Sequence, residues 1–215
     1  NSLKWHNNRP EPLLLKLMNK TRAVIKYFFA LLTITSVVAF LRYPYLVNSS
    51  IYLSPIDESP HAWLIKSLMD GAPLFFYFSD KNYHGITIGL AAIPFFWLLG
   101  VNALAYKLPA IIFHSVYLLT SYFVAKKINK NIGLLVVFLM LLAPQYVFYM
   151  SFQNWPHHLV ALLGNIVFLI VMTLKTPGKK NKKLLIFSLS LIMGLAVYTY
   201  TYSIVFLFTV LVVFI

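Results

Sequence analysis

Residues 24–41 read VIKYFFALLTITSVVAFL, an apolar run whose one charged side chain, Lys26, lies near its start. At 1.5 Å per residue, a helix of this length spans about 27 Å, close to the roughly 30 Å hydrocarbon core of a membrane. The stem of Lys26 is long enough for its ammonium group to reach the interface. This run therefore predicts a membrane-spanning helix, and it guides the interpretation of the other apolar runs.

The composition indicates the same class of protein. The 215 residues are 60% apolar and 11% charged, with a mean hydropathy of +0.77, which excludes an ordinary soluble domain. The formal net charge of +13 would suggest nucleic-acid binding in a soluble protein. Here the basic residues form short clusters between apolar runs, as in cytoplasmic loops, so we expect no nucleic-acid partner. Cysteine is absent, which excludes disulfides and thiolate chemistry within the chain.

The basic clusters predict the orientation of the chain. The N-terminal segment, residues 126–130 and residues 175–183 are basic, and the positive-inside rule places all three in the cytoplasm. The run 86–101 is short and contains Gly89 and Pro94, and a crossing there would put residues 126–130 outside. We therefore expect it to stay on the outer side. The predicted spans are 24–41, 103–125, 132–150, 159–174, 184–202 and the start of another at 204–215, with an outer loop over 42–101.

These features predict an all-α, multi-spanning integral membrane protein. We expect it in a plasma (inner) membrane, with a cytoplasmic N-terminus. The sequence stops within an apolar run, at Phe214 and Ile215, where a terminal carboxylate would lie in hydrocarbon. Residues 1–215 are therefore expected to be the N-terminal part of a longer chain.

The outer loop contains the stretch SPIDESPH, residues 54–61. Only five carboxylates occur in the chain, and none follows Asp80. Ser59 and Pro60 predict the start of a juxtamembrane helix that runs to Met69, before Gly71. The adjacent Asp57 and Glu58 could supply a general base for an acceptor hydroxyl or amine. They could equally be solvated residues that cap the helix.

Most other reactive side chains also fall on the predicted outer face. Basic groups there can hold a phosphate leaving group. Lys107 could do so from the outer end of its span, or could simply anchor the span at the interface. The candidates for substrate binding are His61, Lys81, His84, Lys107, Asn154, His157 and His158.

The histidines allow a second interpretation. His84, His157 and His158, together with the acids, could in principle bind a divalent metal ion. Their spacing fits no named motif, so we expect neither a metal nor another cofactor. His114 lies in the middle of the 103–125 span, where a histidine is either a packed hydrogen-bonding residue or part of a polar cavity.

Several short motifs carry a family resemblance. The stretch from Asp57 to Ile65, DESPHAWLI, is similar to the Asp-Glu-x-x-His-x-x-x-Ile pattern that opens the first juxtamembrane helix of GT-C membrane glycosyltransferases. The segment AYKLPA, residues 105–110, resembles the family's Ala-x-Arg-Leu-Pro-Ser, with Lys107 in place of arginine. The other matching segments are 83–85, 97–100, 143–144 and 194–196. In this order the motifs resemble the polyprenyl-phosphate-sugar-dependent branch, which is related to protein mannosyltransferases and the aminoarabinose transferase.

The resemblance implies a GT-C helical bundle that transfers a sugar, with inversion, at the outer face of the membrane. The donor would be a polyprenyl-phosphate-linked sugar, and the acceptor a lipid, a glycan or a protein. Asp57 matches the family's catalytic aspartate, and Glu58 its acidic neighbour. Two alternatives stay open: a non-catalytic binder or transporter of lipid-linked sugars, and a structural membrane subunit.

Overall fold

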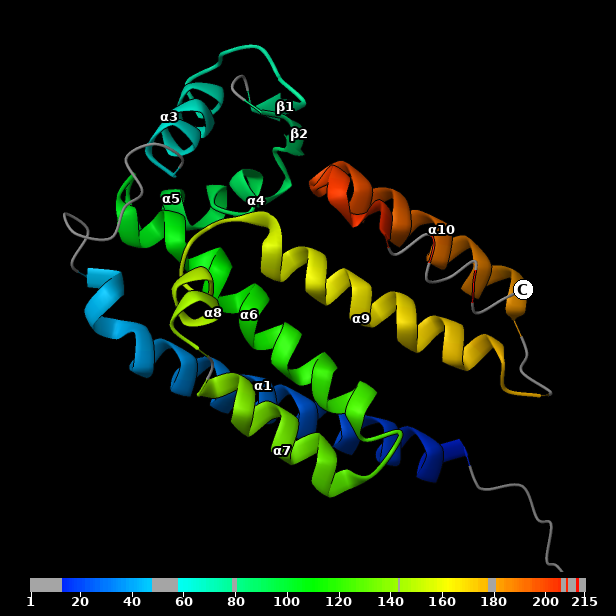
Figure 1. Ribbon diagram of the computed structural model, residues 1–215. Helices are drawn as coiled ribbons and strands as arrows, with labels where there is room; N and C mark the ends of the chain where they lie inside the picture. The colour runs from blue at the N-terminus through cyan, green and yellow to red at the C-terminus, as the bar shows by residue number, and fades with distance from the viewer. Residues whose placement is uncertain are drawn as a thin grey trace, which may run out of the picture.

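The computed structural model describes residues 13–47, 58–78, 81–142, 144–177 and 181–205, together with Phe208 and Val212. In these residues helices dominate, and the one sheet is a short two-stranded hairpin (Figure 1). The predicted helical class is confirmed. Four of the described helices are long and apolar enough to span a membrane, judged by length and composition: Leu17–Val47, Ala103–Ala125, Pro156–Leu174 and Lys182–Thr199.

The centre of the bundle is helix α6, Ala103–Ala125, whose bounds coincide with the predicted span. It begins where the side chain of Asn102 accepts a hydrogen bond of 2.9 Å from the backbone N–H of Ala105, an N-cap. Helix α6 packs against α1 (Leu13–Val47), α7 (Lys130–Leu141) and α9 (Pro156–Leu174), and α9 packs against α10 (Lys182–Thr199). Figure 1 shows α10, α9, α6 and α1 following one another across the bundle.

Helix α1 is longer than the predicted span of 24–41. It continues through Pro44 to Val47, so Arg42 lies within the helix and not in the outer loop. Proline removes one helical hydrogen bond, but the last turn is held by packing, since Arg42 and Leu46 are only 0% and 4% exposed.

The predicted span 132–150 is divided into two helices. Helix α7 ends at Leu141, and α8 covers Gln145–Met150. The reason is Pro144, which has no N–H and disfavours helical backbone at the residue before it. Helix α9 in turn begins at Pro156, so His157 and His158 lie in its first turn and not in a loop.

The C-terminal part also differs from the expected bounds. Helix α10 ends at Thr199, and Tyr200 is extended before a 3-10 turn, η1, over Thr201–Ile204. The predicted span 184–202 is therefore shorter at its end. The span expected at 204–215 lies almost entirely outside the described residues.

A cap of short elements covers one end of the bundle (Figure 1). Its elements are α3 (Glu58–Met69), β1 (Tyr77–Phe78), β2 (Lys81–Gly85), α4 (Thr87–Leu90) and α5 (Ile93–Leu99). Helix α3 begins one residue before the predicted Ser59 and stops before Gly71, which has φ +95° and so takes the left-handed conformation that ends many helices. The hairpin was not predicted. Its strands are antiparallel, with Tyr77 opposite Gly85 and Phe78 opposite Lys81.

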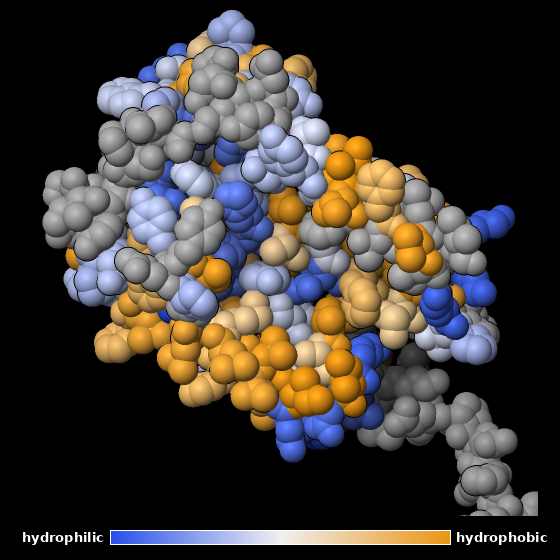
Figure 2. Space-filling view, viewed as in Figure 1, coloured by the Kyte–Doolittle hydropathy of each residue, from blue (hydrophilic) through white to orange (hydrophobic). Residues whose placement is uncertain are grey.

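The main apolar core lies between the cap and the bundle. Buried Ile65, Phe78 and Ile88 from the cap pack in one cluster with Tyr106 of α6 and Leu159 of α9. Figure 2 shows that polar side chains gather between the cap and the start of α9, whereas apolar side chains cover the outside of α7. On this face, one group of polar side chains thus lies at the cap–bundle junction.

Candidate functional site

Glu58 joins the cap to the bundle. It is the first residue of α3 and is 0% exposed. Its Oε1 accepts a hydrogen bond of 2.8 Å from the backbone N–H of Asn154, in the turn before α9. The side-chain amide of Asn154 donates to the carbonyl of Ile88 in α4, at 3.2 Å. One buried carboxylate and one amide therefore fix α3, α4 and the start of α9 relative to one another.

Two residues of α6 face the same carboxylate. Tyr106 is 1% and Lys107 0% exposed, and the charge of Glu58 acts on both side chains. Nζ of Lys107 also lies 5.4 Å from the centroid of the Phe152 ring, within range of a cation–π contact. Lys107 is thus a buried cation opposite an acid, and not the interfacial anchor that the sequence allowed.

Two histidines of the cap are part of an aromatic cluster. The ring of His61 stacks on Phe78, with centroids 3.8 Å apart and an interplanar angle of 21°. It is nearly perpendicular to the ring of His84, with centroids 5.3 Å apart. Both rings are almost fully buried. His84 also pairs through its backbone with Tyr200, whose ring lies 5.5 Å from that of His157. His61, His84 and His157 therefore lie along the contact between the hairpin and the end of α10.

Arg42 lies in the bundle below the cap. Its Nε donates to Oγ of Ser151 at 3.0 Å, and its Cζ is 4.4 Å from the centroid of the Phe148 ring. Ser151 donates in turn to the carbonyl of Phe148 at 2.6 Å. Within the described part of the chain, Nη1 and Nη2 of Arg42 have no hydrogen-bond partner. Arg42 thus holds the turn that leads to Asn154 through Nε, while the N–H groups of both Nη atoms have no partner among the described residues.

His114 and His158 form a pair inside the bundle. Their Nδ1 atoms are 3.2 Å apart, and the rings are 1% and 6% exposed. Since two like nitrogens can share only one proton, one ring donates and the other accepts. The charge of Arg42 acts on both rings. We call Arg42, His114, Ser151 and His158 the inner polar cluster.

The sequence interpretation did not find the inner polar cluster. It treated His114 as a lone histidine and placed His158 in an outer loop. The available signal was Pro156, because proline is common at the first position of a helix. A helix that begins there puts His158 on the same structural element as the apolar run that follows, and within reach of its neighbour α6.

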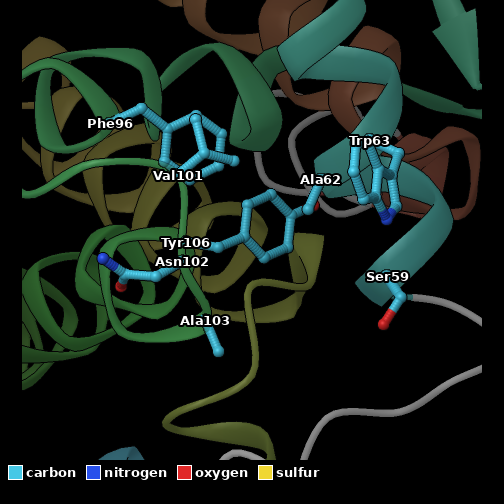
Figure 3. A pocket seen from close by; sticks show the side chains of 8 residues that line it. All are labelled: Ser59, Ala62, Trp63, Phe96, Val101, Asn102, Ala103 and Tyr106. Atoms are coloured by element: carbon cyan, nitrogen blue, oxygen red, sulfur yellow. The ribbon is translucent and has the colours of Figure 1, made fainter.

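A small pocket opens on the other side of Tyr106 (Figure 3). Its volume is about 160 Å³, below the roughly 300 Å³ of typical small-molecule sites, so it can hold only part of a ligand. Trp63 is 70% exposed at its rim. In Figure 3, Trp63 and Ser59 of α3 lie opposite the segment around Asn102. The lining residues are Ser59, Ala62, Trp63, Phe96, Val101, Asn102, Ala103 and Tyr106.

The structure brings the sequence-derived candidates together only in part. Glu58, Lys107 and Asn154 meet at the junction, whereas His158 faces His114. Asp57 and the side chain of Lys81 lie outside the described residues. Within the ranges that the structure describes, no group of three or more His, Cys, Asp or Glu side chains is placed to hold a metal ion.

Comparisons with protein-family models, with curated proteins and with solved structures give no match to this chain. Its class is therefore inferred from its residues and their contacts.

Proposed function

We propose that this chain is part of a membrane-embedded glycosyltransferase of the GT-C type. It would transfer a sugar from a polyprenyl-phosphate donor to an acceptor at the outer face of the membrane. The observation that carries the proposal is the burial of Glu58 at the cap–bundle junction, hydrogen-bonded to Asn154. Asp57, the proposed base, directly precedes Glu58 in the sequence. Ser59, in the DESPH stretch of the resemblance, lines the pocket beside Tyr106.

In the proposed reaction, Asp57 accepts the proton of an acceptor hydroxyl as its oxygen attacks the anomeric carbon. The bond between that carbon and the phosphate oxygen breaks, and its electron pair leaves with the lipid phosphate. The configuration at the anomeric carbon inverts. Lys81 would stabilise the negative charge that develops on the phosphate.

Glu58 has a positioning role in this proposal. Its Oε1 is occupied by the N–H of Asn154, and its side chain is 0% exposed. A group that is buried and already hydrogen-bonded is a poor proton acceptor for a substrate that enters from outside. We therefore assign Asp57 as the base and give Glu58 a structural role at the cap–bundle junction.

The arrangement of the charged loops supports an outward-facing cap. Helix α6 begins at the cap and ends at Ala125, so the basic residues 126–130 lie at the opposite end of the bundle. Helix α9 likewise begins at the cap and ends at Leu174, ahead of the basic residues 175–183. We propose that α1, α6, α9 and α10 span a plasma (inner) membrane, with the N-terminus and these basic segments in the cytoplasm.

Sugar transfer measured in membranes that carry the full-length protein tests the proposal. Labelled polyprenyl-phosphate sugars are the donors, and the wild type is compared with Asp57→Asn, which keeps the size of the side chain and removes the base. The matched control is Asp70→Asn, because Asp70 is an exposed acid at the far end of the same helix and pairs with Lys66.

We expect Asp57→Asn to abolish transfer and Asp70→Asn to leave it unchanged, with equal amounts of inserted protein. Donor binding should persist in Asp57→Asn, because the base acts after binding. Full transfer by Asp57→Asn would remove Asp57 from the mechanism. Binding of donor by the wild type without any transfer would instead identify a lipid-linked-sugar binder or transporter.

A further inference from the structure

A groove runs between α1, α6 and α7, away from the cap–bundle junction. It has a volume of about 360 Å³, within the range of roughly 300 to 1,000 Å³ found for small-molecule sites. Its walls are mostly aliphatic and aromatic, and the polar lining residues are two lysines and two tyrosines. The lining residues are Lys26, Tyr27, Ala30, Ile34, Leu119, Tyr122, Lys126, Leu134, Val137, Phe138 and Leu141.

The two lysines lie at the same end of the groove. Lys26 is the most N-terminal of the α1 residues that line the groove. Lys126 directly follows the C-terminus of α6. The two helices run in opposite directions, so these ends meet. Nζ of Lys126 lies 5.6 Å from the centroid of the Tyr122 ring. The groove therefore has an apolar body and a positively charged mouth, and none of its lining residues is acidic.

The surface around the mouth of the groove is also positively charged. Lys127 and Lys130 are exposed in the segment that joins α6 to α7. Figure 2 shows the apolar outside of α7 with polar side chains at its lower edge, where α7 begins in Figure 1. An anion at the mouth of the groove would thus meet several ammonium groups.

The apolar walls and the basic mouth of the groove favour a lipid as the occupant. Lys26 and Ile34 are about two helical turns apart, which sets a length of about 12 Å. An acyl chain matches the aliphatic and aromatic walls along this length, and an anionic headgroup matches the two lysines at the mouth.

We propose that this groove binds an anionic phospholipid, with one acyl chain between α1 and α7 and the headgroup phosphate on Lys26 and Lys126. The mouth lies at the end of the bundle assigned to the cytoplasm, where anionic lipids are attracted to basic segments. This inference rests on the proposed membrane embedding and is independent of sugar transfer. Any interfacial lysine is expected to extend its ammonium group toward the membrane surface. The proposal adds that Lys26 and Lys126 bind a specific ligand, the lipid phosphate.

Native mass spectrometry of the full-length protein tests the site. The detergent-solubilised protein is titrated with phosphatidylglycerol or with phosphatidylcholine of the same acyl chains. We expect the wild type to bind phosphatidylglycerol at least tenfold more tightly. The double variant Lys26→Gln/Lys126→Gln should lose most of this preference, because two basic contacts to the phosphate are removed.

Two further variants separate this site from general charge effects. Lys182→Gln/Lys183→Gln removes two exposed lysines from the corresponding end of α10 and should keep the preference. Ala30→Trp fills the groove without changing its charge and should weaken binding of both lipids at least fivefold. Far-UV circular dichroism checks that each variant is folded. If Ala30→Trp does not fold, the comparison of the two lysine double variants decides the result.

An unchanged preference in Lys26→Gln/Lys126→Gln would overturn the proposal. So would equal losses in the two lysine double variants, which would indicate attraction to net charge only. If folded Ala30→Trp abolishes self-association but leaves lipid binding intact, the groove holds a second copy of the chain and the proposal fails. Sugar transfer in the same preparations is unaffected by these outcomes, so failure here is distinguishable from failure of the proposed reaction.

Discussion

The backbone N–H of Asn154 donates a hydrogen bond of 2.8 Å to Oε1 of Glu58, across 96 residues of sequence. This contact links the start of α3 to the turn before α9, and neither atom is reached by solvent. The cap of the molecule is therefore fastened to the bundle by a buried charge. Its loss should lower the stability of the fold and loosen the contact of α3 with the turn before α9.

We expect Glu58→Ala to lower the free energy of unfolding by about 2 to 4 kcal/mol, because it leaves a buried N–H without an acceptor and Lys107 without an opposing charge. Thermal unfolding in detergent micelles measures the change. Asp70→Ala is the matched control, since its pair with Lys66 is exposed and its removal should cost less than about 0.5 kcal/mol. Equal effects of the two substitutions would contradict the anchoring role of Glu58.

A pair of glycine substitutions tests the contact of the hairpin with α10. A Cβ at Gly85 would collide with the carbonyl of Tyr198 and lie 3.0 Å from two of its ring atoms. Gly85→Ala should therefore destabilise the protein by about 1 to 3 kcal/mol. Gly194, in α10, has open space around its Cβ position, so Gly194→Ala should stabilise by about 0.5 to 1 kcal/mol. Relative to the wild type, the unfolding midpoint of Gly85→Ala should fall and that of Gly194→Ala should rise.

A double-mutant cycle tests the pairing of His114 with His158. Each single change to leucine removes one partner of the buried Nδ1···Nδ1 contact and should cost about 1 to 3 kcal/mol. The double variant should cost less than the sum of the two, with a coupling energy of about 1 kcal/mol. If the losses in the free energy of unfolding were additive, the two rings would not be hydrogen-bonded to each other.

Arg42 allows stability and activity to be separated. Its two Nη atoms have no partner within the described ranges, and replacing a buried charge with an apolar side chain of similar length is often neutral or stabilising. Arg42→Met should therefore change the free energy of unfolding by less than about 1 kcal/mol, whereas Arg42→Ala should cost about 2 to 5 kcal/mol through the cavity it leaves.

In the transfer assay, Arg42→Met should lower the rate, because the Nε contact that holds Ser151 ahead of Asn154 is lost. Full activity in Arg42→Met would remove this residue from the positioning of the junction. A loss of several kcal/mol in the same variant would instead show that the contacts of Arg42 with Ser151 and Phe148 contribute strongly to stability.

The long helices follow from the sequence, because hydrophobic length and local capping determine them. The bounds of α6 coincide with its predicted span, since Asn102 caps its start and a lysine follows its last residue. Helix α3 was predicted to within one residue from Ser59, Pro60 and Gly71. Each of these signals acts within a few residues of the position that it determines.

Features that depend on tertiary contacts were not predicted. The break at Pro144 is different, because Pro144 and Gln145 interrupt the apolar run and are a local signal that the predicted span 132–150 overlooked. Helix α1 continues past Pro44 because packing of Arg42 and Leu46 holds its last turn. The hairpin likewise depends on Tyr198 of α10, whose hydroxyl donates to the carbonyl of Phe76 at 2.6 Å. Lys107 was placed at the interface because its opposing acid is 49 positions away in the chain.

Helix α7 is too short to reach from one side of a bilayer to the other. Its 12 residues rise about 18 Å, against roughly 30 Å of hydrocarbon. The last carbonyls of α7 lose their helical partners at the turn before Pro144, and lipid chains offer no donors to replace them. In the membrane embedding proposed above, water would have to descend to this depth beside α8 to supply donors, and the solvent boundary would form a depression in the membrane surface. A lipid-linked phosphate could stay hydrated there while lying about 12 Å below the surrounding headgroups.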